Sequence, residues 1–225
     1  MRKSKLTVRL KSVGVAKVLL WLLRIFLALD GLSVILTLIE LAVPVNPPTI
    51  VTLQHLLNDL LIPSLVLSLA TLLLLFVWIY RLHKDLHQCY SSYPIAAWDS
   101  LCRFILPGFN LWGIWNTLMT IAHYFKAETD SLRRYGFLLY RLVPVMYAIF
   151  IASYLLKRLI YRYDYLGRVE SIRDIPEFFV TVAIAAKELL SLSGVIILIA
   201  ITQTIVNAMQ LKFIQISRAN DVNFS

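Results

Sequence analysis

Three histidines have the residue type and spacing that metal chemistry needs. His83 and His87 are four residues apart, so they share one face of a helix, and such a pair can bind a metal ion. His123 is the best third ligand, with Cys89 as the other choice. Membrane enzymes that use this spacing need many more histidines than the four of this chain. We therefore expect a solvated helix next to the membrane, with no metal and no cofactor, and keep a site at His83, His87 and His123 as a minor alternative.

Asp30 is the one acid that a membrane-spanning helix here cannot avoid. It lies midway along the apolar run 18–43, next to Gly31. A charge at that depth costs about 2.5–3.5 kcal/mol on insertion scales and usually faces other helices. Two interpretations stay open. Asp30 is either a helix-packing acid, with Gly31 allowing close approach, or a functional acid that handles protons or cations.

Signatures of common enzymes are missing from the sequence. It contains no GxSxG nucleophile turn, no P-loop and no GxGxxG, and its seven glycines are scattered. Arg81 and Asp85 are four residues apart, which predicts a surface ion pair of only a few tenths of a kcal/mol. We therefore expect no enzymatic activity and no catalytic or cofactor-binding residues.

The elements that position these residues are long apolar helices. The chain has 225 residues, of which 59% are hydrophobic and 16% charged, whereas soluble domains have about 45–50% and about 25%. Apolar runs of 18 or more residues indicate transmembrane helices. We expect a single integral-membrane domain, residues 1–225, folded as an all-α polytopic transmembrane bundle. Its four predicted spans are about 18–43, 60–80, 135–156 and 189–209.

The segments between these spans are predicted as loops. PVNPPTIVTLQH, residues 44–55, holds three prolines and no basic residue. Residues 157–177 mix charges of both signs and are expected to be a solvated connection. Asp174, followed by Pro176 and Glu177, has the pattern of a helix N-terminus.

The net charge of +9 raises the question of nucleic acid, but membrane flanks explain it better. We expect contact with anionic lipid headgroups and no nucleic acid. The tail before Val18 is basic and predicts cytoplasmic N- and C-termini in a multi-pass protein of the bacterial plasma (inner) membrane. A thylakoid or other internal membrane is the alternative. Cys89 and Cys102 have no metal-binding spacing and are expected to be free thiols on the cytoplasmic side.

The stretch FILPGFNLWGIWNTL, residues 104–118, is apolar but interrupted by Pro107-Gly108. Beyond it, polar or small residues form one helical stripe: Asn110, Gly113, Asn116, Thr117, Thr120 and His123. We expect residues 95–125 to form an aromatic re-entrant or interfacial helical hairpin on the cytoplasmic side. A fifth span is the alternative, and the positive-inside count does not separate the two.

Part of the chain resembles a known family. FVWIYRLHKDL (76–86), a Tyr-Pro turn and FILPGFNLW (104–112) are similar to a family of bacterial membrane proteins of unknown function, domain of unknown function 4328. The resemblance covers roughly residues 76–126. The matching positions are Trp78, Tyr80, Arg81, Pro107, Asn110, Leu111 and Trp112. The family more often has Asn at the position of Asp85, and the Gly-Trp pair after its turn is absent here. The resemblance implies four spans and no established chemistry.

The function that these patterns favour is non-catalytic. We expect a small integral-membrane scaffold, assembly or regulatory subunit that binds other membrane protein subunits or itself. Its candidate partner residues are Trp78, Tyr80, Arg81, Pro107, Asn110, Trp112 and Trp115. The alternative is a channel or transporter-like protein with a polar intramembrane path. That path would use Asp30, Asn110, Asn116, Thr120, Gln203 and Asn207.

Overall fold

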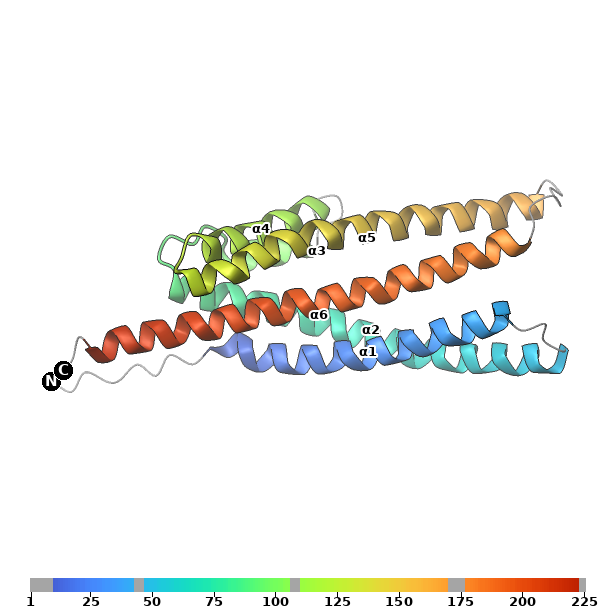
Figure 1. Ribbon diagram of the computed structural model, residues 1–225, viewed down its shortest axis with the longest axis horizontal. Coiled ribbons are helices and arrows are strands. Elements are labelled where there is room, and N and C mark those ends of the chain that lie inside the picture. Colours follow the sequence, from blue (N-terminus) through green and yellow to red (C-terminus); the bar gives the residue numbers. More distant parts are fainter. Residues whose placement is uncertain (1–9, 43–46, 106–109, 170–176, 223–225) are drawn as a thin grey trace. The chain divides into compact units, whose positions relative to one another are not determined.

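The structure is a computed structural model that is all-helical in the part it describes. Backbone is described for residues 10–42, 47–105, 110–169 and 177–222, and side chains for 10–39, 62–105, 112–162 and 182–219. The six helices, coloured along the chain in Figure 1, are α1 (Lys11–Ala42), α2 (Pro47–Cys89), α3 (Ala97–Ile105), α4 (Asn110–Lys126), α5 (Asp130–Val169) and α6 (Glu177–Val222).

Among the described residues, four helices are long and apolar enough to cross a membrane. They are Lys11–Ile39, Ile62–Cys89, Asp130–Arg162 and Val182–Ala219. A span needs about 20 residues at ~1.5 Å each, and α3 and α4 have only 9 and 17. The prediction of a multi-pass, all-α protein with four spans and a short helical hairpin is therefore confirmed.

Two predicted loops are wrong in part, because the helices continue beyond the apolar runs. α2 begins at Pro47, inside the predicted loop 44–55. Proline is tolerated in the first helical turn, where its missing N–H has no partner to lose. α5 extends to Val169 and so covers much of the predicted connection 157–177. It also begins at Asp130, five residues before the predicted span. The predicted N-cap at Asp174 lies outside the described residues.

The chain divides into two compact units, and each long helix contributes one part to each unit. Unit 1 contains Met1–Trp21, Leu72–Arg141 and Ile201–Ser225, and therefore holds α3 and α4. Unit 2 contains Leu22–Thr71 and Leu142–Ala200.

The core of unit 1 follows helical periodicity. Ile201, Ile205 and Met209 are buried at intervals of four along α6, and Leu132 and Leu139 are buried two turns apart on α5. This spacing places the buried residues of each helix on one face. The buried apolar residues of α2 and α4 in this core are Trp78, Ile79, Leu82, Leu86, Leu118, Ile121, Ala122 and Phe125.

Two glycines bring the short helices into close contact with their neighbours. A Cβ on Gly113 of α4 would lie 2.6 Å from Cβ and 2.7 Å from the carbonyl oxygen of Arg103 on α3. A Cβ on Gly136 of α5 would lie 2.5 Å from the backbone nitrogen of Lys126 and 2.8 Å from the carbonyl oxygen of Ala122. Small residues of this kind allow helix backbones to approach. α3 and α4 consequently lie against each other (Figure 1).

Replacing Gly136 tests this packing. Gly136→Ala places a methyl group against backbone, which cannot move as a flexible side chain does, so we expect a loss of about 1–3 kcal/mol of stability. The measurement is the thermal unfolding midpoint of the purified protein in detergent. Gly14→Ala is the control, because a Cβ there meets no atom within 4 Å and alanine favours helix by up to ~1 kcal/mol. Equal midpoints for the two variants would contradict the packing argument.

Candidate functional site: the α3–α4 hairpin

Asp85 connects α2 to the start of α1. Its side chain is buried, and Oδ2 accepts a hydrogen bond from the Ser12 backbone N–H at 2.8 Å. Ser12 lies in the first turn of α1, where backbone N–H groups have no partner within the helix and negative charge is favourable. Arg81 is exposed and makes no ion pair within the described part of the chain. The predicted Arg81–Asp85 surface pair is therefore wrong, because the carboxylate faces α1.

The paired histidines contact backbone. His83 is 1% exposed and its Nδ1 lies 2.8 Å from the Ile79 carbonyl oxygen. Since a carbonyl only accepts, Nδ1 is the donor. Nε2 of His87 lies 2.9 Å from the Ile95 carbonyl oxygen. His123 is exposed on α4. Among the described residues, no three His, Cys, Asp or Glu side chains form a group that could hold a metal ion.

A cluster of tyrosines joins the end of α2 to α4. The Tyr93 ring packs against His83 and His87, with centroids 5.7 and 5.4 Å apart. Tyr124 packs edge-on against both Tyr90 and Tyr93 at 5.3 Å. Such tilted and edge-on arrangements suit aromatic quadrupoles. Burial raises the pKa of Tyr90 and of Tyr93, so both phenols stay protonated at neutral pH.

The α4–α5 turn is connected to α6 by polar contacts. Nζ of Lys212 donates to Oε1 of Glu128 at 2.5 Å and lies 4.9 Å from the Tyr90 ring centroid. The Gln215 amide donates to the Thr129 hydroxyl at 3.2 Å. Lys212 and Gln215 lie about one helical turn apart on α6, so both reach the connection between α4 and α5. These contacts restrict the position of the hairpin within unit 1.

The polar stripe predicted along α4 does not form one surface. Gly113 and Thr117 are buried, Asn116 is half-buried and His123 is exposed. The Thr120 hydroxyl donates to the Asn116 carbonyl oxygen at 2.7 Å and so satisfies itself within its own helix. Of this stripe, Gly113 serves packing against α3.

The exposed side chains of the hairpin are mixed in character. On α3, Trp98 is 68% and Ile105 56% exposed, and Asp99 and Cys102 are exposed beside them. On α4, Trp112 is 61% exposed. We call this set, together with His123, the hairpin surface. It combines large aromatic area with charged and polar groups.

The residues that match the family resemblance are dispersed. Trp78 is buried in the core, and Tyr80 packs on Trp98 with ring centroids 5.3 Å apart. Arg81 and Trp112 are exposed, and Trp115 is half-buried with a partner. Pro107 lies outside the described residues, and Asn110 is described only as the first residue of α4. Of the predicted partner residues whose side chains are described, Trp112 and Arg81 are exposed.

Sequence reasoning missed the residues that hold the hairpin in place. Tyr93, Tyr124 and Lys212 were not singled out, although tyrosines are frequent in residues 90–93 and the partners lie far along the chain. The sequence shows only that tyrosines are frequent just before Pro94. This frequency does not identify which distant residues the tyrosines contact.

Asp30 lies in unit 2, next to α6. The Ser191 side chain hydrogen-bonds its carboxylate, and Lys187 and Glu188 are close enough to act on it electrostatically. Oδ2 of Asp30 is buried and has no other partner among the described residues. Lys187 itself pairs with Glu188, with Nζ 2.6 Å from Oε1. A Cβ on Gly31 would lie 3.9 Å from Leu192, so a methyl group at this position of α1 would make ordinary contact with α6.

Comparison with models of protein families, with curated proteins and with solved structures finds no match for this chain. The function is therefore inferred from the hairpin surface, from the buried polar groups of unit 1 and from the polar residues around Asp30 in unit 2.

The role of Asp85 as a cap between helices is testable by substitution. Asp85→Ala leaves the Ser12 N–H without its charged acceptor, and we expect a loss of about 1.5–3 kcal/mol, the range for hydrogen bonds to charged groups. Asp85→Asn keeps an acceptor oxygen and should lose less. Arg81→Ala is the control and should stay within about 0.5 kcal/mol. The thermal midpoint in detergent measures all three, and equal losses for Arg81→Ala and Asp85→Ala would refute the cap.

Proposed function

We propose that this protein is a non-catalytic scaffold, assembly or regulatory subunit of the bacterial plasma membrane, and that the hairpin surface binds other membrane proteins. The observation that carries this proposal is which side chains of unit 1 are buried and which are exposed. His83 and Asp85 are closed inside, 1% and 2% exposed, whereas Trp98 and Trp112 are 68% and 61% exposed. A substrate needs accessible polar groups, while a binding surface needs accessible aromatic anchors.

The mixture of residues favours a protein partner over hydrocarbon. In the central part of the α2 span, the large exposed residues, such as Leu65, Val66 and Leu69, are apolar, as a lipid-facing surface requires. The hairpin surface places Asp99 and Cys102 beside Trp98. Charged side chains are costly against hydrocarbon, whereas protein interfaces combine tryptophan with a polar rim.

The orientation belongs to the same proposal. The tail before Val18 carries only basic charge, which supports a cytoplasmic N-terminus. Four spans then place the C-terminus and the α3–α4 hairpin on the cytoplasmic side as well. The resemblance to the bacterial membrane family over residues 76–126 agrees with this arrangement.

Removing the aromatic anchors should release partners. Trp98→Ala and Trp112→Ala each delete a large exposed side chain, and anchors of this type contribute about 2 kcal/mol or more to binding. The measurement is mild-detergent affinity purification of the tagged protein from its native membrane, with quantitative mass spectrometry of co-purified membrane subunits. We expect both variants to lose most of the stoichiometric partner.

Trp21→Ala is the matched control, because Trp21 is 65% exposed on α1, outside the hairpin. It should retain the partner at the wild-type level. Equal recovery of partners from all three variants, or a wild-type protein that purifies with no partner, would count against the proposal.

A second candidate is a channel or transporter-like function, and the observation that favours it is the polar cluster of Asp30. An intramembrane acid with a hydroxyl partner and a lysine nearby is a common feature of ion and proton pathways. This function would place Asp30 on the path of the transported species.

Asp30→Asn separates the two candidates. It removes the charge and keeps the size and a hydrogen-bonding side chain. In the transport function, proton or cation flux into liposomes containing the purified protein should fall to the background level. In the scaffold function, wild type and variant should both show background flux, and only stability should change. Asp130→Asn is the control, since the Asp130 side chain is 92% exposed at the start of α5.

A further inference from the structure

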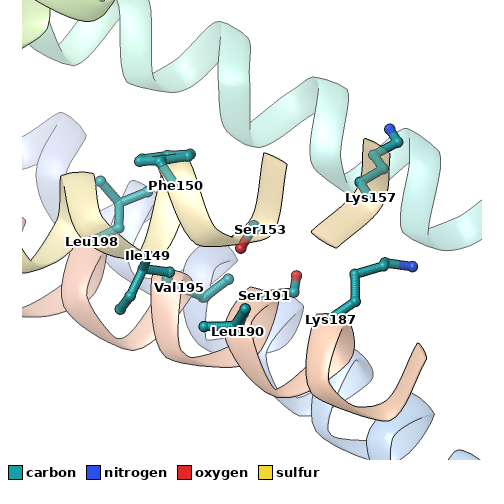
Figure 2. A pocket seen from close by; sticks show the side chains of 10 residues that line it. Ile149, Phe150, Ser153, Lys157, Lys187, Leu190, Ser191, Val195 and Leu198 are labelled. Carbon is teal, nitrogen blue, oxygen red and sulfur yellow. The ribbon is translucent and has the colours of Figure 1, made fainter. Parts of the chain in front are cut away.

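Unit 2 contains a groove between α5 and α6 that is separate from the hairpin surface. Its volume is about 310 Å³, at the lower end of the ~300–1,000 Å³ typical of small-molecule sites. Figure 2 shows side chains of both helices around it. Gly194 lies in its wall, with Ile149 as the nearest side chain to its Cβ position at 3.6 Å. The missing side chain of Gly194 leaves part of this space open.

The groove is polar at one end and apolar at the other. Lys157 and Lys187 lie at one end, on opposite sides of the groove and with their amino groups pointing apart, Ser153 and Ser191 come next, and the remaining wall is apolar (Figure 2). Ile149 and Phe150 on α5, and Leu198 on α6, form the apolar end. Residues 149–157 extend about 12 Å along α5 at ~1.5 Å per residue.

The lysine end lies where the apolar runs of the two helices end. Lys157 directly follows the apolar run 135–156 of α5, and Lys187 lies two residues before the apolar run 189–209 of α6. Both lysines are therefore expected near the depth of lipid headgroups, on the side of the α5–α6 connection. The apolar end points from there toward the middle of the membrane. The basic, hydroxyl and apolar parts of the groove follow one another in the order that suits the phosphate, the glycerol esters and an acyl chain of a phospholipid.

Positive charge at the lysine end comes from Lys157 and Lys187. Lys187 is 40% exposed and pairs with Glu188, and Asp30 lies close to both. Lys157 is exposed and has no ion pair within the described part of the chain. It is therefore the cation that is available to a phosphate, and Lys187 adds donors that can be shared with it.

We propose that this groove is a binding site for one anionic phospholipid. The phosphate binds at Lys157 and Lys187, the glycerol ester region lies beside Ser153 and Ser191, and an acyl chain packs on Ile149, Phe150 and Leu198 across Gly194. The site is independent of the hairpin surface, and its failure would leave the docking proposal unaffected.

Native mass spectrometry of the purified, delipidated protein tests the site. The probes are phosphatidylglycerol and phosphatidylcholine with identical acyl chains, added separately in matched detergent micelles. We expect wild type to retain one phosphatidylglycerol in preference to phosphatidylcholine. Lys157→Ala and Lys187→Ala should each weaken retention about fivefold, as expected for one basic residue near an anionic surface. Gly194→Phe fills the groove and should abolish retention of that lipid.

Arg158→Ala is the control, because Arg158 is the exposed neighbour of Lys157 but does not line the groove. It should bind like wild type. The rise in thermal midpoint on adding phosphatidylglycerol gives a second measurement, in which each variant is compared with its own lipid-free midpoint, so a change in folding stability does not obscure binding. Equal retention of both lipids, or equal losses for Arg158→Ala and Lys157→Ala, would mean that only bulk annular lipid is bound and would overturn the proposal.

Discussion

Hydrocarbon offers a protein backbone no hydrogen-bond partner, and the helices of this chain follow from that constraint. Within the spans, two hydroxyl groups bond to their own helix: Thr37 donates to the Ser33 carbonyl at 3.0 Å, and Ser193 donates to that of Leu189 at 2.8 Å. Between α2 and α3, where the chain is not helical, side chains supply hydrogen-bond partners to the backbone. His87 contacts the Ile95 carbonyl oxygen and the Tyr124 hydroxyl donates to that of Ser92. The non-helical segment before the hairpin is thus satisfied by protein groups.

The two units are stabilised in different ways, and this difference bears on function. Unit 1 combines an apolar core with directional contacts: a capped helix, a tyrosine cluster and the Lys212–Glu128 pair. Directional contacts fix the position of α3 and α4, and a pre-formed surface binds its partner at a lower cost in conformational entropy. Unit 2 is mainly apolar in the described part, with one polar cluster around Asp30 and Ser191. Docking therefore suits unit 1, and contact with lipid suits unit 2.

The apolar runs were enough to predict four spans and a short hairpin, because hydrophobicity over about 20 residues reflects the thickness of a bilayer. They did not predict where helices end, since α2 begins at Pro47 and α5 continues to Val169 in water-compatible sequence. Asp85 shows why the site was harder. Local spacing offered Arg81 as its partner, but Ser12 is 73 residues away and only tertiary structure brings it near. Trp78 and Trp112 both belong to the family resemblance, yet Trp78 is buried and Trp112 is exposed. The sequence does not show which face of its helix packs against the core.

Ser191 connects the Asp30 cluster to the groove and limits what Asp30 can do. The Ser191 side chain hydrogen-bonds the Asp30 carboxylate and also lines the groove between α5 and α6. A phospholipid in the groove covers Ser191 on that side and keeps water from reaching the carboxylate through it. Lys187 pairs with Glu188 at 2.6 Å, so it is only partly available to balance Asp30. An ion path needs continuous access of water to its acid, whereas a helix-packing acid needs only a fixed donor such as Ser191. Occupancy of the groove by lipid would therefore favour a packing role for Asp30 and, with it, the scaffold function over transport.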